Sequence, residues 1–175
     1  MEKLTNHYQL YINGEWQSGS KSQIMHSENP RNNKPWASFD CASKEDIDDA
    51  VGYAKNALAS RAWGSLNATE RGKLLFKLAD LIEKNADKIG KIETKDSGKL
   101  LAETVTQTKY VSDYYRYFAG LADKIEGSTL PIDKKDMHVY TTHHPIGVVA
   151  AVVPWNAQMF LTATKLAPAL AAGCS

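Results

Sequence analysis

The sequence predicts an α/β fold in which an N-terminal layer of helices packs against the start of a parallel sheet. Between residues 43 and 127, apolar side chains recur at the three- and four-residue spacing of amphipathic helices. Residues 146–153 then form an uninterrupted apolar run with many β-branched side chains, typical of a strand buried on both faces of a parallel sheet. A helix-forming segment follows this run. The order strand, loop, helix indicates the opening of a βαβ unit.

The composition excludes several broad classes of protein. Of the 175 residues, 43% are hydrophobic and 23% are charged, as in an ordinary globular domain rather than a disordered, collagen-like or membrane protein. The 21 Lys and Arg against 20 Asp and Glu leave a formal net charge of +1, so binding to nucleic acid or to a membrane is not expected. Cys41 and Cys174 lie far apart, and no apolar export signal opens the chain. A cytoplasmic protein is therefore expected.

The N-terminal elements are predicted to be short. Residues 8–16 contain two β-prone runs around Asn13-Gly14, which supplies the two positive φ angles of a tight hairpin turn. Residues 19–35 are rich in Ser, Asn, Lys and Pro, so an irregular connection is expected there. A short strand is expected at residues 37–41.

Four amphipathic helices are predicted next. They are expected to start at Ser43, at Asn67 or Thr69, at Ala86 and at Leu101. Ser43 and Asp46 have the spacing of a capping box, and Ser97-Gly98 supplies a stop for the third helix near Lys95. The fourth helix is expected to continue to Gly127. The core stripe predicted for the second helix is Leu74, Leu75, Leu78, Leu81 and Ile82.

Beyond Gly127 the pattern changes from helical to alternating. Residues 128–132 and 137–142 flank a polar turn, which predicts a second hairpin. The apolar strand at residues 146–153 is expected to end at Pro154. A helix over residues 158–172 follows, with a kink at Pro168.

The loop after the predicted strand is the first candidate for a functional site. In open α/β sheets, ligands bind outside the carboxyl ends of strands, and here that position is held by Pro154, Trp155 and Asn156. The Asn156 amide could donate to a developing oxyanion or to a ligand oxygen. From spacing alone, the N-cap of the next helix is the favoured interpretation of Asn156.

Lys165 is the only charged residue between Met137 and the C-terminal Ser175. A partly buried lysine can take part in proton transfer, whereas a lysine on the flank of a helix commonly extends its head group to water. No metal site is expected. His143 and His144 are adjacent, so on a strand they would point to opposite faces, and no Cys, Asp or Glu lies near them at ligand spacing.

Several motifs, taken together and in order, resemble the NAD(P)-dependent aldehyde dehydrogenase superfamily. The resemblance covers nearly the whole chain. The matching segments are Tyr11-Ile12-Asn13-Gly14-Glu15-Trp16, Asn29-Pro30, Asp96-Ser97-Gly98-Lys99, Phe118-Ala119-Gly120, His144-Pro145-Ile146-Gly147-Val148-Val149, Pro154-Trp155-Asn156 and Lys165-Leu166-Ala167-Pro168.

The resemblance implies a chemistry and a set of roles. In this superfamily a Cys thiolate attacks an aldehyde, hydride passes to NAD or NADP, and a Glu-activated water hydrolyses the thioester. Asn156 would stabilise the oxyanion and Lys165 would assist near the active site. Val153, Pro154, Trp155 and Asn156 would line the cofactor cleft. Asp96 would contribute a backbone oxygen to a monovalent-cation site.

The resemblance also implies how the chain is divided and how it assembles. Residues 1–127 would form the N-terminal part of the cofactor-binding domain, residues 128–145 a hairpin of the oligomerisation arm, and residues 146–175 the first strand, loop and helix of the nucleotide-binding sheet. A homo-oligomer, either a dimer or a tetramer, is expected.

The departures from the superfamily pattern are equally informative. The superfamily's nucleophilic Cys, general-base Glu and glycine-flanked cofactor turn have no match here, because they would follow Gly173. Cys174 is expected at a helix C-terminus, where the helix dipole raises a thiol pKa, so it is a poor nucleophile. The chain is therefore expected to be an N-terminal portion without activity of its own. The alternatives are a non-catalytic truncated product that assembles with full-length subunits, or a degraded reading frame.

A second departure concerns the aldehyde tunnel. Ala157-Gln158 stands where the superfamily often has Phe-Pro, and Leu161 and Thr164 stand where bulkier Met and Trp are frequent. Smaller side chains at these positions imply a wider tunnel. A preference for bulky or aromatic aldehydes is therefore expected.

Overall fold

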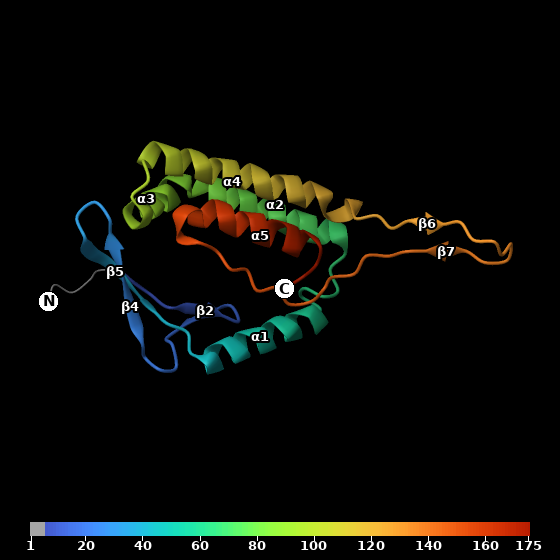
Figure 1. Cartoon of the computed structure of the whole chain (residues 1–175), viewed down its shortest axis with the longest axis horizontal. Helices are drawn as coiled ribbons and strands as arrows, with labels where there is room; N and C mark the ends of the chain where they lie inside the picture. The colour runs from blue at the N-terminus through green and yellow to red at the C-terminus, as the bar shows by residue number, and fades with distance from the viewer. Residues whose placement is uncertain (1–5) are drawn as a thin grey trace.

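The computed structural model describes residues 6–175 and shows an elongated arrangement of helices and short strands (Figure 1). The strands are β1 (His7–Tyr8), β2 (Leu10–Ile12), β3 (Glu15–Gln17), β4 (Ile24–Asn29), β5 (Lys34–Asp40), β6 (Thr129–Leu130) and β7 (Val139–Tyr140). The α-helices are α1 (Lys44–Ala59), α2 (Ala68–Lys84), α3 (Ala86–Ser97), α4 (Leu101–Leu121) and α5 (Gln158–Ala171). Two 3₁₀ turns, η1 (Ala122–Lys124) and η2 (Trp155–Ala157), adjoin α4 and α5.

The layout places the helices between two β structures. Helices α2, α3, α4 and α5 lie side by side, with the β1-β5-β4 sheet at one end and the β6–β7 hairpin at the other (Figure 1). Helix α1 lies below this group, and the C-terminus lies between α1 and α5 (Figure 1). Within residues 6–175, no helix combines the length and the apolar character that a membrane span needs.

The first hairpin is confirmed, but the connection after it is not irregular. Strands β2 and β3 pair in antiparallel fashion around Asn13 (φ 54°) and Gly14 (φ 82°). The prediction of an irregular segment over residues 19–35 is wrong, because β4 there pairs antiparallel with β5, which is itself longer than the strand expected at 37–41. Strand β4 was missed because most of its residues face solvent, so no apolar alternation marks it.

The predicted helix starts are confirmed, but the fourth helix was expected to continue to Gly127 and instead ends as α4 at Leu121, followed by η1 to Lys124. Ser43 Oγ accepts from the Asp46 backbone N–H, and the Asp46 carboxylate accepts in return from the Ser43 N–H at 2.7 Å, which completes a capping box. The hydrogen bond from the Ser43 N–H is the main cause that holds the pKa of Asp46 below its ordinary value, against the opposing effect of burial. Asn67 and Glu70 form a second capping box at α2. Gly98 ends α3 in the left-handed conformation, with φ 78°.

The core lies between α2, α4 and α5. Its buried side chains are Leu75, Ala79, Ile82, Val111, Tyr115, Ala119, Ala122, Ala163, Ala167 and Ala171. The alanines allow the helix axes to approach closely, and burial raises the pKa of Tyr115. The predicted stripe of α2 needs correction at two positions, because Leu74 is 43% exposed and Leu81 is 58% exposed. Gly72 and Ala79 share the buried face instead, since a helix face in contact with a neighbour accepts small residues.

Ionic contacts hold α2 and α4 together at the surface. The Arg116 guanidinium on α4 donates to Asp80 at 2.8 Å and to Glu83, both on α2, and to Asp113 at 3.0 Å. These carboxylates raise the pKa of Arg116, so the guanidinium stays charged at any ordinary pH. The carboxylates are exposed, so we assign this network an orienting role rather than a large stabilising one.

The second hairpin is confirmed and is shorter than predicted. Strands β6 and β7 pair Thr129 with Tyr140 and Leu130 with Val139, and the Thr141 N–H donates to the Ser128 carbonyl at 2.8 Å. The hairpin extends away from the helices as an arm (Figure 1).

Residues 146–153 form no strand in the described structure, so the expectation of a strand buried on both faces is wrong there. Ile146 is 89% exposed and Val152 is 83% exposed. A buried parallel strand needs a paired strand along each edge and a packed layer on each face. In the described chain, Ser175 is the only residue that pairs with this segment. Its N–H donates to the Gly147 carbonyl at 3.2 Å, and its carbonyl accepts from the Val149 N–H at 2.8 Å. This alternation is that of a parallel pair.

Helix α5 is confirmed close to its predicted bounds, with Pro168 inside it. The last residues tie it to α1. The Trp63 indole N–H donates to the Cys174 carbonyl at 3.1 Å, and Ser175 Oγ donates to the Ala54 carbonyl at 2.9 Å. Together with the core, these contacts fix the C-terminal end of α5.

Candidate functional site

The candidate site is the loop that joins the segment 146–153 to α5. Pro154 is in the extended region (φ −74°, ψ 157°), and residues 155–157 form the 3₁₀ turn η2. Trp155 is 76% exposed and Asn156 is also exposed, whereas Val153 and Ala157 are half-buried. The loop therefore presents an indole ring and a carboxamide to the space beyond the end of this segment.

Asn156 does not cap the following helix. Helix α5 has Ala157 at its N-cap and η2 has Pro154, and neither position makes a side-chain capping hydrogen bond. The capping alternative for Asn156 is therefore excluded. Its amide is left available to a ligand.

The predicted tunnel residues lie at the N-cap of α5 and along one strip of the helix. Leu161 and Thr164 are three residues apart, so they share one side of α5, and Ala157 precedes them as the N-cap residue of the helix. This strip is next to the core-facing strip of Ala163 and Ala167, and all three side chains are half-buried. Thr164 Oγ1 donates to the Leu161 carbonyl at 2.9 Å, which turns its hydroxyl toward the backbone.

Lys165 is exposed on α5. Its exposure favours the interpretation of a lysine with its head group in water over that of a partly buried one. The assisting role that the resemblance implies stays a prediction.

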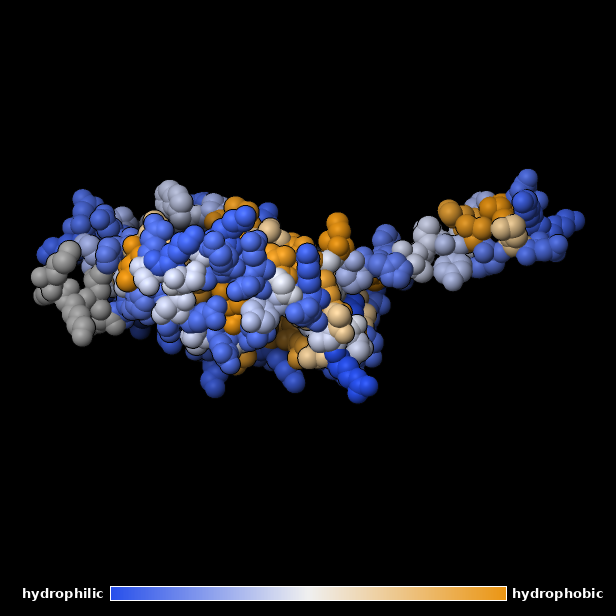
Figure 2. Space-filling model, turned by 90° about the horizontal axis from the view of Figure 1, so that it is seen from below, coloured by the Kyte–Doolittle hydropathy of each residue, from blue (hydrophilic) through white to orange (hydrophobic). Residues whose placement is uncertain are grey.

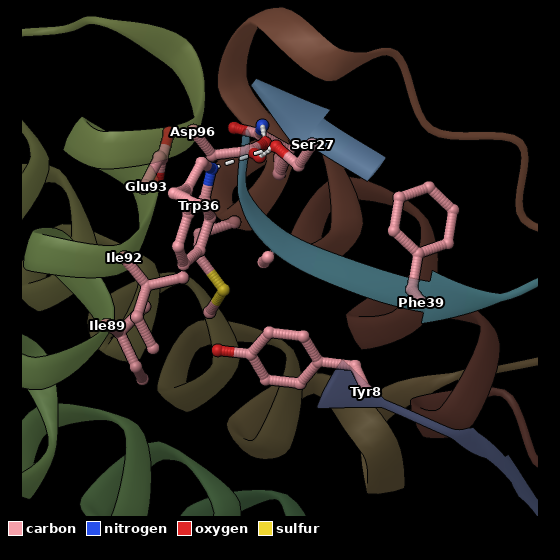
Figure 3. A pocket seen from close by; sticks show the side chains of 11 residues that line it. Tyr8, Ser27, Trp36, Phe39, Ile89, Ile92, Glu93 and Asp96 are labelled. Carbon is pink, nitrogen blue, oxygen red and sulfur yellow. Dashed lines mark hydrogen bonds between the residues drawn. The ribbon is translucent and has the colours of Figure 1, made fainter. Parts of the chain in front are cut away.

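Sequence reasoning missed a chain of hydrogen bonds that reaches the loop from three other elements. Gln158 Nε2, at the start of α5, donates to Asp96 Oδ2 at 2.8 Å. Asp96, on α3, accepts a second hydrogen bond at Oδ1 from Ser27 of β4. Ser27 Oγ in turn accepts from the indole N–H of Trp36, on β5, at 2.9 Å (Figure 3). The four residues are far apart in sequence, and only Asp96 belonged to a recognised motif.

A cavity of about 460 Å³ lies against this chain of hydrogen bonds. It is lined by Tyr8, Ser27, Trp36, Ala37, Phe39, Ile89, Ile92, Glu93, Asp96, Gln158 and Met159 (Figure 3). Most of these side chains are apolar. The Lys95 ammonium lies 5.1 Å from the centre of the Trp36 ring, a cation–π contact that helps to hold the indole in place.

The structure limits what Asp96 can do as a cation ligand. Both of its carboxylate oxygens already accept hydrogen bonds, from Ser27 and from Gln158. Glu93, nearby on α3, is 4% exposed, and its Oε1 accepts from Lys99 Nζ at 3.2 Å. Among residues 6–175, no group of three or more His, Cys, Asp or Glu side chains could hold a metal ion. A contribution from the Asp96 backbone oxygen stays a prediction.

Comparisons with known proteins agree with this arrangement. A model of the aldehyde dehydrogenase family matches residues 16–175. A (Z)-2-((N-methylformamido)methylene)-5-hydroxybutyrolactone dehydrogenase from Acinetobacter baylyi is 50% identical over 168 residues, which are 96% of this chain and 34% of that protein. A betaine aldehyde dehydrogenase from Bacillus subtilis is 36% identical, over 94% of this chain and 34% of its own length.

Solved structures match as well. An aldehyde dehydrogenase from Bacillus cereus superposes with a TM-score of 0.94 at 36% identity, over 98% of this chain and 35% of that one. A betaine aldehyde dehydrogenase from Staphylococcus aureus, solved in complex with NAD+, gives a TM-score of 0.91 at 34% identity, over 95% of this chain and 33% of that one. The chain thus spans about a third of the length of these relatives. Its sequence and its fold both show that the chain belongs to the aldehyde dehydrogenase family.

Proposed function

We propose that this chain supplies the N-terminal third of an enzyme that oxidises an aldehyde to a carboxylic acid with NAD or NADP. The observation that carries the proposal is the position of Asn156 in a chain of this family. Its carboxamide is exposed and caps no helix, and it stands in the loop between residues 146–153 and α5. A side-chain amide in such a place can donate to the oxyanion that forms when a nucleophile adds to a carbonyl group.

The residues before Asn156 fit contact with the nicotinamide half of the cofactor. The exposed indole of Trp155 and the half-buried Val153 offer apolar surface next to the amide, and Pro154 holds the turn between them. The bound cofactor would supply the hydride acceptor for aldehyde oxidation. The part of this chain is to orient its nicotinamide end and to exclude water from that side.

The nucleophile and the general base would come from outside the matched region. Cys174 is buried after the end of α5, and its carbonyl is held by Trp63. A buried thiol is not accessible to an aldehyde, so Cys174 does not fit the role of the nucleophile. We therefore propose that the 175-residue chain by itself turns over no aldehyde.

A chimeric enzyme tests this division of labour. This chain would replace the corresponding N-terminal third of the Acinetobacter baylyi relative, and NAD and NADP reduction would be followed at 340 nm. We expect no aldehyde-dependent reduction by the isolated chain and clear turnover by the chimera. Turnover by the isolated chain, or a folded chimera that binds cofactor but oxidises no aldehyde, would contradict the proposal.

The tunnel strip points to a bulky substrate. Leu161 and Thr164 on α5, and Ala157 at its N-cap, have small or medium side chains. The name of the Acinetobacter baylyi relative describes a substituted hydroxybutyrolactone as its substrate, which supports a roomy site. We expect the chimera to have a higher kcat/KM for benzaldehyde than for acetaldehyde. Replacing Ala157 by Phe should narrow the difference, and a preference of the unaltered chimera for acetaldehyde would count against a wide tunnel.

The β6–β7 arm is proposed to bind a second subunit. Its strands are only two residues long and leave backbone edges unpaired, while Leu130, Ile132, Met137 and Tyr140 are between 41% and 64% exposed. Figure 2 shows apolar side chains gathered near the free end of the arm. A partner strand along this edge would satisfy the backbone groups and cover the apolar side chains.

The arm can be tested by its effect on assembly. We expect the chimera to sediment as a dimer or tetramer, and Leu130→Asp combined with Met137→Asp to shift it toward monomer. Lys134→Asp is the matched control, because it adds a carboxylate in the polar turn of the same arm. Equal sedimentation of the double variant and of the unaltered chimera would show that the arm is not the contact.

A further inference from the structure

The start of α5 is held differently from its end. The C-terminal end is fixed by the alanine-rich core and by the Ser175 and Trp63 hydrogen bonds. In the loop before α5, Val152 and Trp155 are 83% and 76% exposed, and the η2 turn contacts α3 and the start of α5. For residues 145–160, the Gln158–Asp96 hydrogen bond is the only side-chain hydrogen bond recorded in the described structure.

The Asp96 side of this hydrogen bond is rigidly anchored. Asp96 lies in the last turn of α3, which packs against α4, and its other oxygen is held by Ser27 of β4. Ser27 is held in turn by the Trp36 indole, whose ring carries the cation–π contact with Lys95. An anionic acceptor also makes the bond from the Gln158 amide stronger than a bond between two neutral groups. Gln158 is therefore tied to a fixed point on three elements.

We propose that Gln158 is a positioning residue for Asn156, and this rests on the proposed role of Asn156 as the oxyanion donor. Gln158 follows Asn156 by two residues, across the η2 turn, so the place of its side chain fixes the place of the turn. An oxyanion donor must stay within a few tenths of an ångström of its productive position. The hydrogen bond to Asp96 supplies a directional restraint on the turn, in addition to the packing of Met159 and Phe160 against the core.

The pairing also explains why the chain can do without the proline that the family frequently has at this position. Proline at position 158 would fix φ at the first residue of α5 and stiffen the turn through the backbone. Gln158 has φ −53°, within the range of proline, but here a side-chain hydrogen bond provides the restraint.

A donor–acceptor swap tests the pairing in the 175-residue chain. Gln158→Glu places a carboxylate against Asp96 and removes the donor, so the two like charges should repel at neutral pH. Adding Asp96→Asn restores one hydrogen bond with its direction reversed, because Asn at 96 can still accept from Ser27 while its amide donates to Glu at 158. Gln158→Leu removes the bond without adding charge. Gln9→Leu, which loses the exposed Gln9–Ser18 bond of the first hairpin, is the matched control.

Backbone NMR order parameters of Asn156 and Ala157 are the readout. We expect values of about 0.85 in the unaltered chain and in Gln9→Leu, and below about 0.6 in Gln158→Leu and in Gln158→Glu at pH 7. The double swap should return them toward the original values. Lowering the pH of Gln158→Glu should do the same, since one carboxyl of the pair then keeps a proton. Unchanged order in Gln158→Leu, or no recovery in the swap, would overturn the proposal.

The chimera separates this inference from the function on which it rests. There, Gln158→Leu should lower kcat about tenfold with KM little changed, and should add nothing to an Asn156→Ala background, because the positioned group is already gone. Additive losses in the double variant would contradict positioning through Asn156. A chimera without any activity would count against the proposed function, whereas the order parameters of the isolated chain would still decide the role of Gln158.

Discussion

Replacing Asn156 by alanine in the chimeric enzyme is expected to lower kcat by about 100- to 1,000-fold, the usual effect of removing one oxyanion donor. The Asn156 amide is exposed and engaged in no helix cap, so its removal leaves no buried group unpaired and does not disturb the fold. The oxyanion exists only after the nucleophile has added. The loss should therefore fall on kcat and leave KM nearly unchanged.

Two further variants distinguish the loss of the hydrogen-bond donor from the loss of side-chain volume. Asn156→Asp keeps the size but exchanges a donor for a charged acceptor, so it should lose at least as much activity as Asn156→Ala. Asn56→Ala, at an exposed position of α1, should leave kcat within about twofold. Steady-state kinetics under saturating cofactor measure all three. A rise in KM alone for Asn156→Ala would show ground-state binding rather than stabilisation of the oxyanion.

The elements predicted well from the sequence are those whose signals are local. Ser43 and Asp46 lie within one turn of each other, Asn13-Gly14 defines its own turn, and Gly98 needs only a positive φ to end a helix. Each of these depends on backbone geometry within a few residues. The rest of the fold does not alter them.

The elements predicted poorly depend on what surrounds them. Strand β4 has no buried residue and is mostly polar, so only its pairing with β5 reveals it. Residues 146–153 have the composition of a buried strand, yet in the described chain a single residue, Ser175, pairs with them. An apolar composition shows that a segment could be buried. Whether it is buried depends on the elements that pack against it.

The same distinction between local and long-range features applies to the candidate site. The sequence offered Asn156 as a candidate from its place after a predicted strand, and Ala157, Leu161 and Thr164 as candidates from the resemblance, and these roles stay predictions. It did not show Gln158 meeting Asp96, 62 residues away. Hydrogen bonds between distant side chains leave no periodic trace in a single sequence. The choice between helix cap and ligand donor for Asn156 likewise needed the observed start of α5.

The substitution Gly72→Ala, which adds a single methyl group, is expected to disrupt the packing of α2 against α4. A Cβ built there would lie 2.6 Å from the Ala119 carbonyl oxygen, which is backbone and cannot rotate away. The two helices would have to separate, and overpacking of this kind costs about 1–3 kcal/mol. Because α5 packs on α4 beside Ala119, the shift should also loosen the helix that carries the site.

Gly52 offers the matched comparison. It also lies inside a helix, α1, but a Cβ there would meet no atom within 4 Å. Gly52→Ala should therefore stabilise the chain by about 0.5–1 kcal/mol, because alanine loses less backbone entropy in a helix than glycine. Gly72→Ala gains the same entropy and should still be destabilised, so the sign of the change separates packing from propensity. Urea unfolding measures the free energy of unfolding of both variants. Equal stabilisation by both would mean that the space between α2 and α4 accommodates an additional methyl group.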